Sequence, residues 1–325
     1  MEFEGYNEII RQWTQGVLDT YRKDAELTIK YCNELIDYGS RTADPKILGF
    51  AYYYLAGTLY CLNDCENIFD ICIKAIENLE KASAWDLLAK AYNILGIITS
   101  GRGNLPVAYD YYLDGLMYCE KYNLKAESSL ISINCGVLNI EAGRCREAMD
   151  YFERALTYIL SFPDEPDYHT KAIAALENII MCKVLENDFD GIDGLLEEIE
   201  VHHMPYADAV DRMGILISKA FYLHKSGQTE KRDACIAEID GNITKSLIYM
   251  DLIEDFFVYA DVLYEAEKTE EFWHLIDIMD PMISSMSVTS MKMKILAVKI
   301  KFYRRHAMNA EYLQAAGLYY ELSER

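Results

Sequence analysis

The sequence predicts an all-α fold, a solenoid of successive helical hairpins, and three observations lead to this prediction. Small and apolar residues recur with a period of 40 residues. Within each period the apolar residues follow the i, i+3, i+4, i+7 spacing of one helix face. Only 6 of the 325 residues are proline. Because proline destabilises the interior of a helix, so low a count is compatible with a mostly helical chain. A repeated pair of helices satisfies all three observations.

The period is clearest between Ser129 and Ile159. A small pair inside an apolar run is followed by a break and then by small and aromatic residues at helical spacing: Cys135-Gly136, Gly143-Arg144, Ala148, Phe152 and Ala155. Forty residues earlier the same places hold Leu95-Gly96, Gly103-Asn104, Ala108, Tyr112 and Gly115. The period therefore predicts a repeating structural unit.

The repeat extends over the whole chain as a single array, 1–325, with a slip of four residues at 161–166. It predicts eight units, near 9–48, 49–88, 89–128, 129–172, 173–212, 213–252, 253–292 and 293–325. Within the third unit, Gly101–Asn104 ends one helix and Pro106 begins the next, since the first turn tolerates a missing N–H. The other prolines are predicted at junctions between units: Pro45, Pro163, Pro166, Pro205 and Pro281.

The charge and the cysteine content indicate which partners and which cellular compartment to expect. The chain has 53 acidic and 31 basic side chains, a formal net charge of −22, which argues against nucleic acid as a partner. No apolar run is long enough for a membrane helix, and no signal peptide follows Met1, so neither membrane nor export is expected. The 9 cysteines include no Cys-x-x-Cys pair. Free thiols in a reducing cytoplasm explain this best.

No arrangement of residues indicates catalysis. Cys61 and Cys65 could form half of a metal site, but two further ligands at metal spacing are missing. His202-His203 is expected in a surface loop rather than in a metal or proton-transfer role. No nucleophile with a nearby base can be recognised. The sequence therefore predicts no enzyme activity, no metal and no cofactor.

The small-aromatic-small residues Ala108-Tyr112-Gly115 and Ala148-Phe152-Ala155, behind Leu95-Gly96 and Cys135-Gly136, resemble the tetratricopeptide repeat (TPR). The period of 40 is longer than the usual ~34 residues. The chain looks like the TPR sensor regions of bacterial signalling proteins such as TPR-bearing diguanylate cyclases, although no Gly-Gly-Asp-Glu-Phe signature is present. The resemblance implies a right-handed superhelix whose first helices line a concave groove.

By this resemblance, the first helix of each unit carries the ligand-facing residues. The expected peptide groove contains Trp13, Tyr53, Tyr60, Asn93, Ile97, Ile133, Asn134, Val137, Asn178, Ile217, Phe221 and Phe257. Glu177 also falls on a ligand-facing place. Two interpretations stay open: these residues form an apolar groove for a peptide, or neighbouring helices bury them. The three asparagines either bond a peptide backbone or only cap and bridge helices.

The predicted function is non-catalytic binding of a protein or peptide ligand in a cytoplasmic bacterial regulatory or signalling protein. The alternative is a self-association scaffold, a homodimer held through the groove or the terminal units; a helical enzyme is a third, weaker alternative. Three acid–base pairs, 40 residues apart, are also predicted between the last two units: Glu254–Lys294, Asp261–Lys301 and Glu265–Arg305. In the rival interpretation, the basic residues of the last unit form a patch for an acidic ligand or nucleic acid: Lys292, Lys294, Lys299, Lys301, Arg304 and Arg305.

Overall fold

The computed structural model describes residues 3–62, 67–165, 167–244, 247, 252–285 and 289–324. Throughout these ranges the regular secondary structure is helical, with sixteen α-helices and two short helices of other types. The chain divides into two compact units, Met1–Leu138 and Asn139–Arg325, and the boundary falls within helix α7. The predicted all-α class is confirmed.

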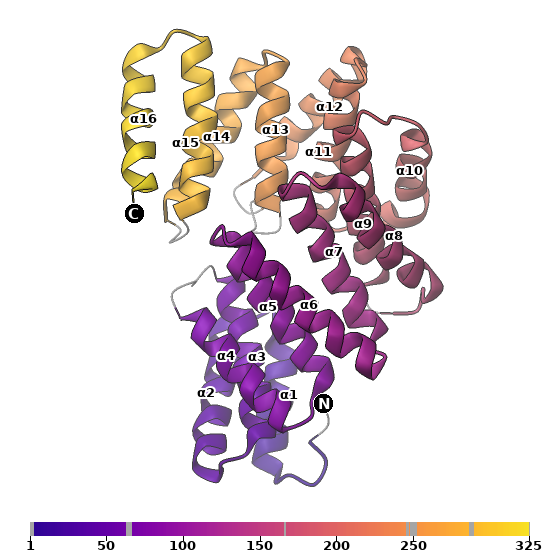
Figure 1. The fold of residues 1–325 in the computed structure, drawn as a ribbon, viewed down its shortest axis with the longest axis vertical. Helices are drawn as coiled ribbons and strands as arrows, with labels where there is room; N and C mark the ends of the chain where they lie inside the picture. The colour runs from indigo at the N-terminus through magenta and orange to yellow at the C-terminus, as the bar shows by residue number, and fades with distance from the viewer. Residues whose placement is uncertain are drawn as a thin grey trace. The chain divides into compact units, whose positions relative to one another are not determined.

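The first unit is a series of helices joined by short connections (Figure 1). Its helices are α1 (Glu8–Thr20), α2 (Ala25–Thr42), α3 (Pro45–Cys61), α4 (Ile68–Lys81), α5 (Trp85–Gly101), α6 (Leu105–Tyr122) and α7 (Lys125–Glu141). Each helix packs on the next from α1 to α6, and α3 also packs on α5. Fully buried side chains such as Phe50, Leu79 and Leu95 form its core.

The second unit continues the pattern with one irregular segment. Its helices are α8 (Cys145–Ser161), α9 (Tyr168–Leu185), α10 (Ile192–Glu198), the π-helical turn η1 (Ile199–His203), the 3₁₀ turn η2 (Met204–Tyr206), α11 (Ala209–Lys225), α12 (Thr229–Asn242), α13 (Ile253–Glu265), α14 (Thr269–Ser285), α15 (Thr289–Arg305) and α16 (Asn309–Ser323). In Figure 1, α15 and α16 lie side by side. Phe152, Phe256 and Phe272 are fully buried.

The forty-residue period is visible in the backbone. Two series of residues adopt left-handed backbone conformations at the turns: one is Ala43, Ser83, Asn123 and Asp167, and the other is Gly103, Gly143, Asn187, Gly227, Glu267 and Ala307. Within each series the spacing is 40 residues except for one step of 44, from 123 to 167 and from 143 to 187. The four-residue slip expected at 161–166 is therefore present in the structure.

Small residues of the repeat allow the two helices of a hairpin to pack closely. A Cβ placed on Gly96 of α5 would lie 2.3 Å from Cε1 of Tyr112 on α6. A Cβ on Gly16 of α1 would lie 2.6 Å from Cε2 of Tyr31 on α2. Each glycine thus lets the aromatic ring of the following helix lie directly on its backbone.

Pro281 is an exception to the predicted proline placement, because it lies inside α14 rather than at a junction. Met279 and Ile283 on either side of it are both fully buried. Their burial holds the helix together across a residue that cannot donate an N–H bond, so packing outweighs the local cost. Pro45 lies at the start of α3 and Pro205 in η2, as expected, whereas Pro166 lies outside the described residues.

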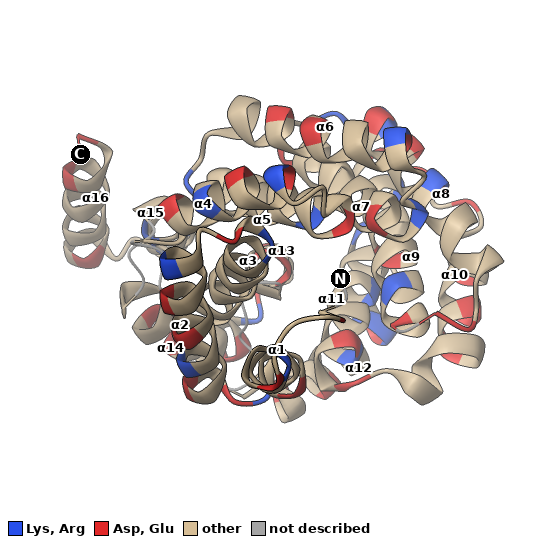
Figure 2. Cartoon of the chain, turned by 90° about the horizontal axis from the view of Figure 1, so that it is seen from below, with Lys and Arg blue, Asp and Glu red and all other residues tan. Residues whose placement is uncertain are grey.

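Acidic and basic residues are interspersed along helices of both units, α6 and α12 among them (Figure 2). Helix α16 differs, since its charged side chains are acidic. No helix in the part of the chain that the structure describes combines the length and the apolar character needed to cross a membrane.

Candidate functional site

The first helices of the second unit pack in sequence, α9 on α11, α11 on α13 and α13 on α15. Side chains about forty residues apart therefore meet between neighbouring helices. Thr170 Oγ1 donates a hydrogen bond of 3.1 Å to Asp211 Oδ2, and Ser218 Oγ donates one of 3.0 Å to Glu177 Oε1. Both pairs join α9 to α11.

Three carboxylates from three successive first helices interact electrostatically, and we call Glu177, Asp211 and Asp255 the acidic row. Glu177 lies directly on the backbone of α11, since a Cβ on Gly214 would be 2.8 Å from its Oε1. Among the described residues, no lysine, arginine or histidine forms an ion pair with any of the three. The row is therefore a cluster of three carboxyl groups for which the described residues supply no basic partner.

Burial shapes the chemistry of the acidic row. It raises the pKa of Asp255 to about 7, with the negative charge of Glu254 adding to the effect. Burial also holds the pKa of Glu177 well above its ordinary value; the charges of Asp255 and Asp211 raise it further, and the Ser218 hydroxyl opposes them. Burial and the charge of Asp208 raise the pKa of Asp211. A cation brought to this surface would favour the ionised carboxylates.

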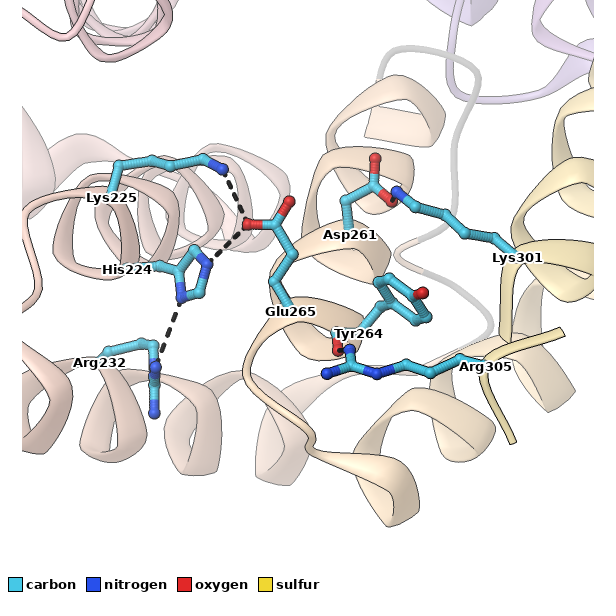
Figure 3. Close-up of polar contacts among 8 residues, drawn as sticks. All are labelled: His224, Lys225, Arg232, Asp261, Tyr264, Glu265, Lys301 and Arg305. Atoms are coloured by element: carbon cyan, nitrogen blue, oxygen red, sulfur yellow. Dashed lines mark hydrogen bonds and ion pairs between the residues drawn. The ribbon is translucent and has the colours of Figure 1, made fainter. Parts of the chain in front are cut away.

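A second group of charged residues lies at the ends of α11, α13 and α15 (Figure 3). Lys225 Nζ and His224 Nε2 lie 2.8 and 2.9 Å from Glu265 Oε2, which connects α11 to α13. Lys301 Nζ lies 2.6 Å from Asp261 Oδ1, which connects α13 to α15. Unlike the acidic row, this polar group is compensated internally.

Two of the three predicted acid–base pairs are confirmed, because Lys294 Nζ also lies 2.5 Å from Glu254 Oε1. The third, Glu265–Arg305, is wrong. Glu265 turns toward α11, while Arg305 bonds the Tyr264 carbonyl oxygen at 2.7 Å and Glu267 Oε1 at 2.7 Å. The guanidinium also lies 4.8 Å from the centre of the Tyr264 ring. Lys225 lies at the same forty-residue offset on the other side of Glu265 and takes the place that Arg305 was expected to fill.

In the first unit, the predicted groove residues are half-buried or buried. Asn134 Nδ2 donates a 2.8 Å hydrogen bond to Oδ1 of the buried Asn93, so these asparagines bridge α7 and α5. Tyr53 contacts Tyr54 with ring centres 5.0 Å apart. Ile133 is buried, with 6% of its surface exposed. The remaining residues are half-buried: Trp13, Tyr60, Ile97 and Val137.

In the second unit, the predicted apolar groove residues are buried between helices. Ile217, Phe221 and Phe257 expose 0%, 7% and 9% of their surfaces. Asn178 Nδ2 donates to the Ala174 carbonyl oxygen of its own helix. Their packing roles are thus established, and contact with a ligand stays a prediction for all twelve groove residues.

His203 corrects the expectation of a surface loop. It lies in the π-helical turn η1, 1% exposed, whereas the adjacent His202 is exposed. The π turn points consecutive histidines in different directions, so only one reaches the interior. Cys61 is an exposed thiol, and Cys65 lies outside the described residues. Within the described ranges no three histidine, cysteine or acidic side chains are placed to hold a metal ion.

Sequence reasoning marked Glu177 as ligand-facing but missed Asp255 and Asp211. A signal for Asp255 existed, because the places forty and eighty residues earlier hold the buried apolar residues Ile215 and Ala175. An acid in an otherwise apolar register position marks an unusual environment. Asp211 carries no such signal, since an acid in the first turn of a helix is ordinary.

Solved structures share this fold. RapI in its apo form matches with a TM-score of 0.69 at 11% identity, covering 86% of this chain and 100% of that one. A Rap protein complexed with competence and sporulation factor matches with a TM-score of 0.67 at 12% identity, covering 100% and 88%. Yeast Tom70 matches with a TM-score of 0.57 at 17% identity, covering 99% and 66%. The chain is a TPR-like helical repeat solenoid.

Another structure similar to this chain is the Rap conjugation gene regulator of plasmid pLS20 in complex with the Phr* peptide. Its TM-score is 0.62 at 12% identity, and the match covers 86% of this chain and 76% of that one. At such low identity these matches establish the fold alone. No protein-family model and no curated protein sequence matches the chain.

Proposed function

We propose that this chain is a non-catalytic, peptide-binding repeat module of a bacterial regulatory protein in the cytoplasm, and that its ligand carries a basic residue. The observation that carries the proposal is the acidic row, three carboxyl groups on α9, α11 and α13 that form no ion pair with any basic side chain of the described residues. The Rap structures, one of them a complex with the Phr* peptide, support peptide recognition as a function of this fold.

The basic ligand residue follows from electrostatics. Two half-buried carboxylates that interact with each other are costly to ionise without a cation. A guanidinium or ammonium group of a peptide would offset this cost by donating charge-assisted hydrogen bonds to the carboxylates of the row. Ordinary salt bridges occupy the charged residues at the ends of α11 and α13, so those residues are already satisfied. The acidic row therefore offers a cationic ligand the larger gain.

The net charge of −22 also favours a cationic partner, because a strongly acidic surface attracts cationic segments and repels nucleic acid. Self-association is the alternative, in which a basic segment of a second copy takes the place of the peptide. Neither partner requires chemistry by this chain.

The test is selection of a random phage-displayed 12-residue peptide library on the full chain at pH 7.5. We expect the selected peptides to be enriched in arginine or lysine. The variant Glu177→Gln/Asp255→Asn should lose both the enrichment and most of the binding. The matched control, Glu230→Gln/Glu238→Gln, removes two exposed acids of α12 and should select the same peptides as the native chain.

Two results would contradict the proposal in different ways. Selection of the same basic peptides by the Glu177→Gln/Asp255→Asn variant would move the site away from the acidic row. Recovery of no specific peptide by the native chain would refute peptide binding itself. Sedimentation of the unliganded chain as a dimer that dissociates in the same variant would favour self-association.

A further inference from the structure

The segment between α10 and α11 is held by an unusual contact between two histidines. His169 is the second residue of α9, and His203 ends the π-helical turn. Their Nδ1 atoms lie 3.1 Å apart. At this distance one Nδ1 must carry a proton and donate it to the other, because two bare nitrogens would repel each other and two N–H groups would clash.

Burial makes this contact sensitive to protonation. His203 is 1% exposed, and its Nε2 is the single buried side-chain polar atom without a hydrogen-bond partner among the described residues. Glu198 Oε1 lies 4.0 Å from that Nε2. Since a carboxylate faces Nε2, the favoured arrangement puts a proton on His203 Nε2 and lets His169 Nδ1–H donate to His203 Nδ1.

Aromatic and charged side chains of α9, η1, η2 and α11 surround the histidine pair. Tyr168 of α9 and Tyr206 of η2 contact the two rings, and Tyr206 stacks on His169 with ring centres 3.9 Å apart. The exposed His202 faces the other oxygen of Glu198, at 3.8 Å. Arg212 of α11 donates to the Met204 carbonyl oxygen at 2.8 Å, so its charge holds the backbone of the same segment.

We propose that His169 and His203 form a proton-sensitive latch that holds residues 199–206 against α9 and releases them on acidification. A first added proton can enter at His169 Nε2 and leaves the Nδ1–H···Nδ1 hydrogen bond in place. A second proton must bind His203 Nδ1, which removes the acceptor and sets two imidazolium ions face to face. Burial and the charge of His169 both lower the pKa of His203, in agreement with this order.

The latch has a defined pH dependence. When segment 199–206 is open, His203 regains the ordinary histidine pKa of about 6.5, and the open state then binds one proton more than the closed state. The opening equilibrium should therefore rise by up to about tenfold for each pH unit below ~6.5. Because the segment leads into α11, which carries Asp211 and Ser218, acidification would loosen one support of the acidic row.

Hydrogen exchange followed by mass spectrometry tests the latch on the full chain between pH 5 and pH 8, after correction for intrinsic exchange rates. Peptides covering 199–206 should lose protection as pH falls, by close to tenfold per unit below ~6.5. His203→Asn keeps an acceptor for His169 Nδ1–H but cannot be protonated, so its protection should be independent of pH. His202→Gln, next to it but exposed, should keep the native profile.

Nitrogen-15 NMR of the histidine rings in the unmodified chain gives an answer that needs no variant. At pH 8 we expect His169 as the Nδ1–H tautomer and His203 as the Nε2–H tautomer, with His203 titrating below the ordinary histidine range. Titration of His203 as a free imidazole would overturn the latch. Protection of 199–206 that does not change with pH in the native chain would overturn it as well.

Discussion

At the left-handed turns, some residues adopt a backbone conformation that their side chain disfavours. Gly103, Gly143 and Gly227 adopt positive φ without strain, but Ala307 occupies the equivalent place with φ of 54°. In an L-residue this conformation is unfavourable, because the Cβ lies too close to the backbone. The packing of the helices on both sides imposes the turn. The position in the repeat, rather than the type of residue found there, therefore determines the backbone conformation.

Ala307→Gly should therefore stabilise the chain by roughly 0.5–1 kcal/mol, the usual difference for alanine in a left-handed turn after the greater chain entropy of glycine is subtracted. Gly227→Ala is the matched opposite change. It should destabilise the chain by a similar amount, because alanine is strained at positive φ and its Cβ would have no neighbour within 4 Å to offset that strain. Urea unfolding of both variants checks the signs. If both substitutions changed the free energy of unfolding in the same direction, side-chain contacts rather than backbone conformation would determine stability at these positions.

A second prediction at the residue scale concerns the pH dependence of Asp255→Asn. The folded state raises the pKa of Asp255 to about 7, above its ordinary value in an unfolded chain. The folded chain therefore binds the proton more tightly, and stability falls as pH rises from about 4 toward 7. Asparagine removes this penalty. The variant should gain thermal stability over the native chain at pH 8 and little or none at pH 4.

Differential scanning calorimetry at the two pH values measures the difference directly. Glu238→Gln on α12 serves as the control, because its parent carboxylate is exposed. A gain for Asp255→Asn that is the same at both pH values would mean that the carboxylate is not neutralised by folding.

At the scale of helices, the charged pairs between α13 and α15 should orient the last hairpin more than they stabilise it. Asp261 and Lys301 are 50% and 46% exposed, so solvent screens their attraction. A double-mutant cycle with Asp261→Asn and Lys301→Met should give a coupling energy of about 0.2–1 kcal/mol at low salt. The coupling should shrink in about 1 M NaCl. A salt-independent coupling would indicate packing rather than charge.

The helices could be predicted from the sequence because their signals are local. Gly96 and Tyr112 occupy places that recur from period to period, and the turn residues repeat at the same interval. The acidic row could not be predicted in full, because Glu177 and Asp255 lie 78 positions apart and come within electrostatic reach only through the packing of α9, α11 and α13. The position of Pro281 inside α14 likewise depends on the burial of its neighbours, which a local rule cannot weigh.

At the scale of the whole molecule, stability should vary along the repeat, because each hairpin of a solenoid is supported by its neighbours. Ala315 is the buried residue of α16, whose Leu313 and Tyr320 are 69% and 62% exposed. Helix α5 buries a series of residues from Leu87 to Thr99. Amides of α16 should exchange with solvent at least on the order of a hundredfold faster than those of α5.

Native-state hydrogen exchange measures this difference, and Ala315→Asp sharpens it. The variant should speed exchange in α15 and α16 while leaving α3 and α5 unchanged. Equal acceleration in all four helices would show that the chain unfolds as one cooperative unit instead.

The regular offset of the side-chain contacts also has a consequence for synthesis on the ribosome. Contacts such as Asn93–Asn134, Glu177–Ser218 and Asp261–Lys301 join residues only 40 or 41 positions apart. At ~5–20 residues per second, each first helix waits only about 2–8 seconds for its partner to emerge. A nascent chain of this kind never leaves a long apolar stretch without a partner, and it can dock hairpins one by one in the order in which they are translated.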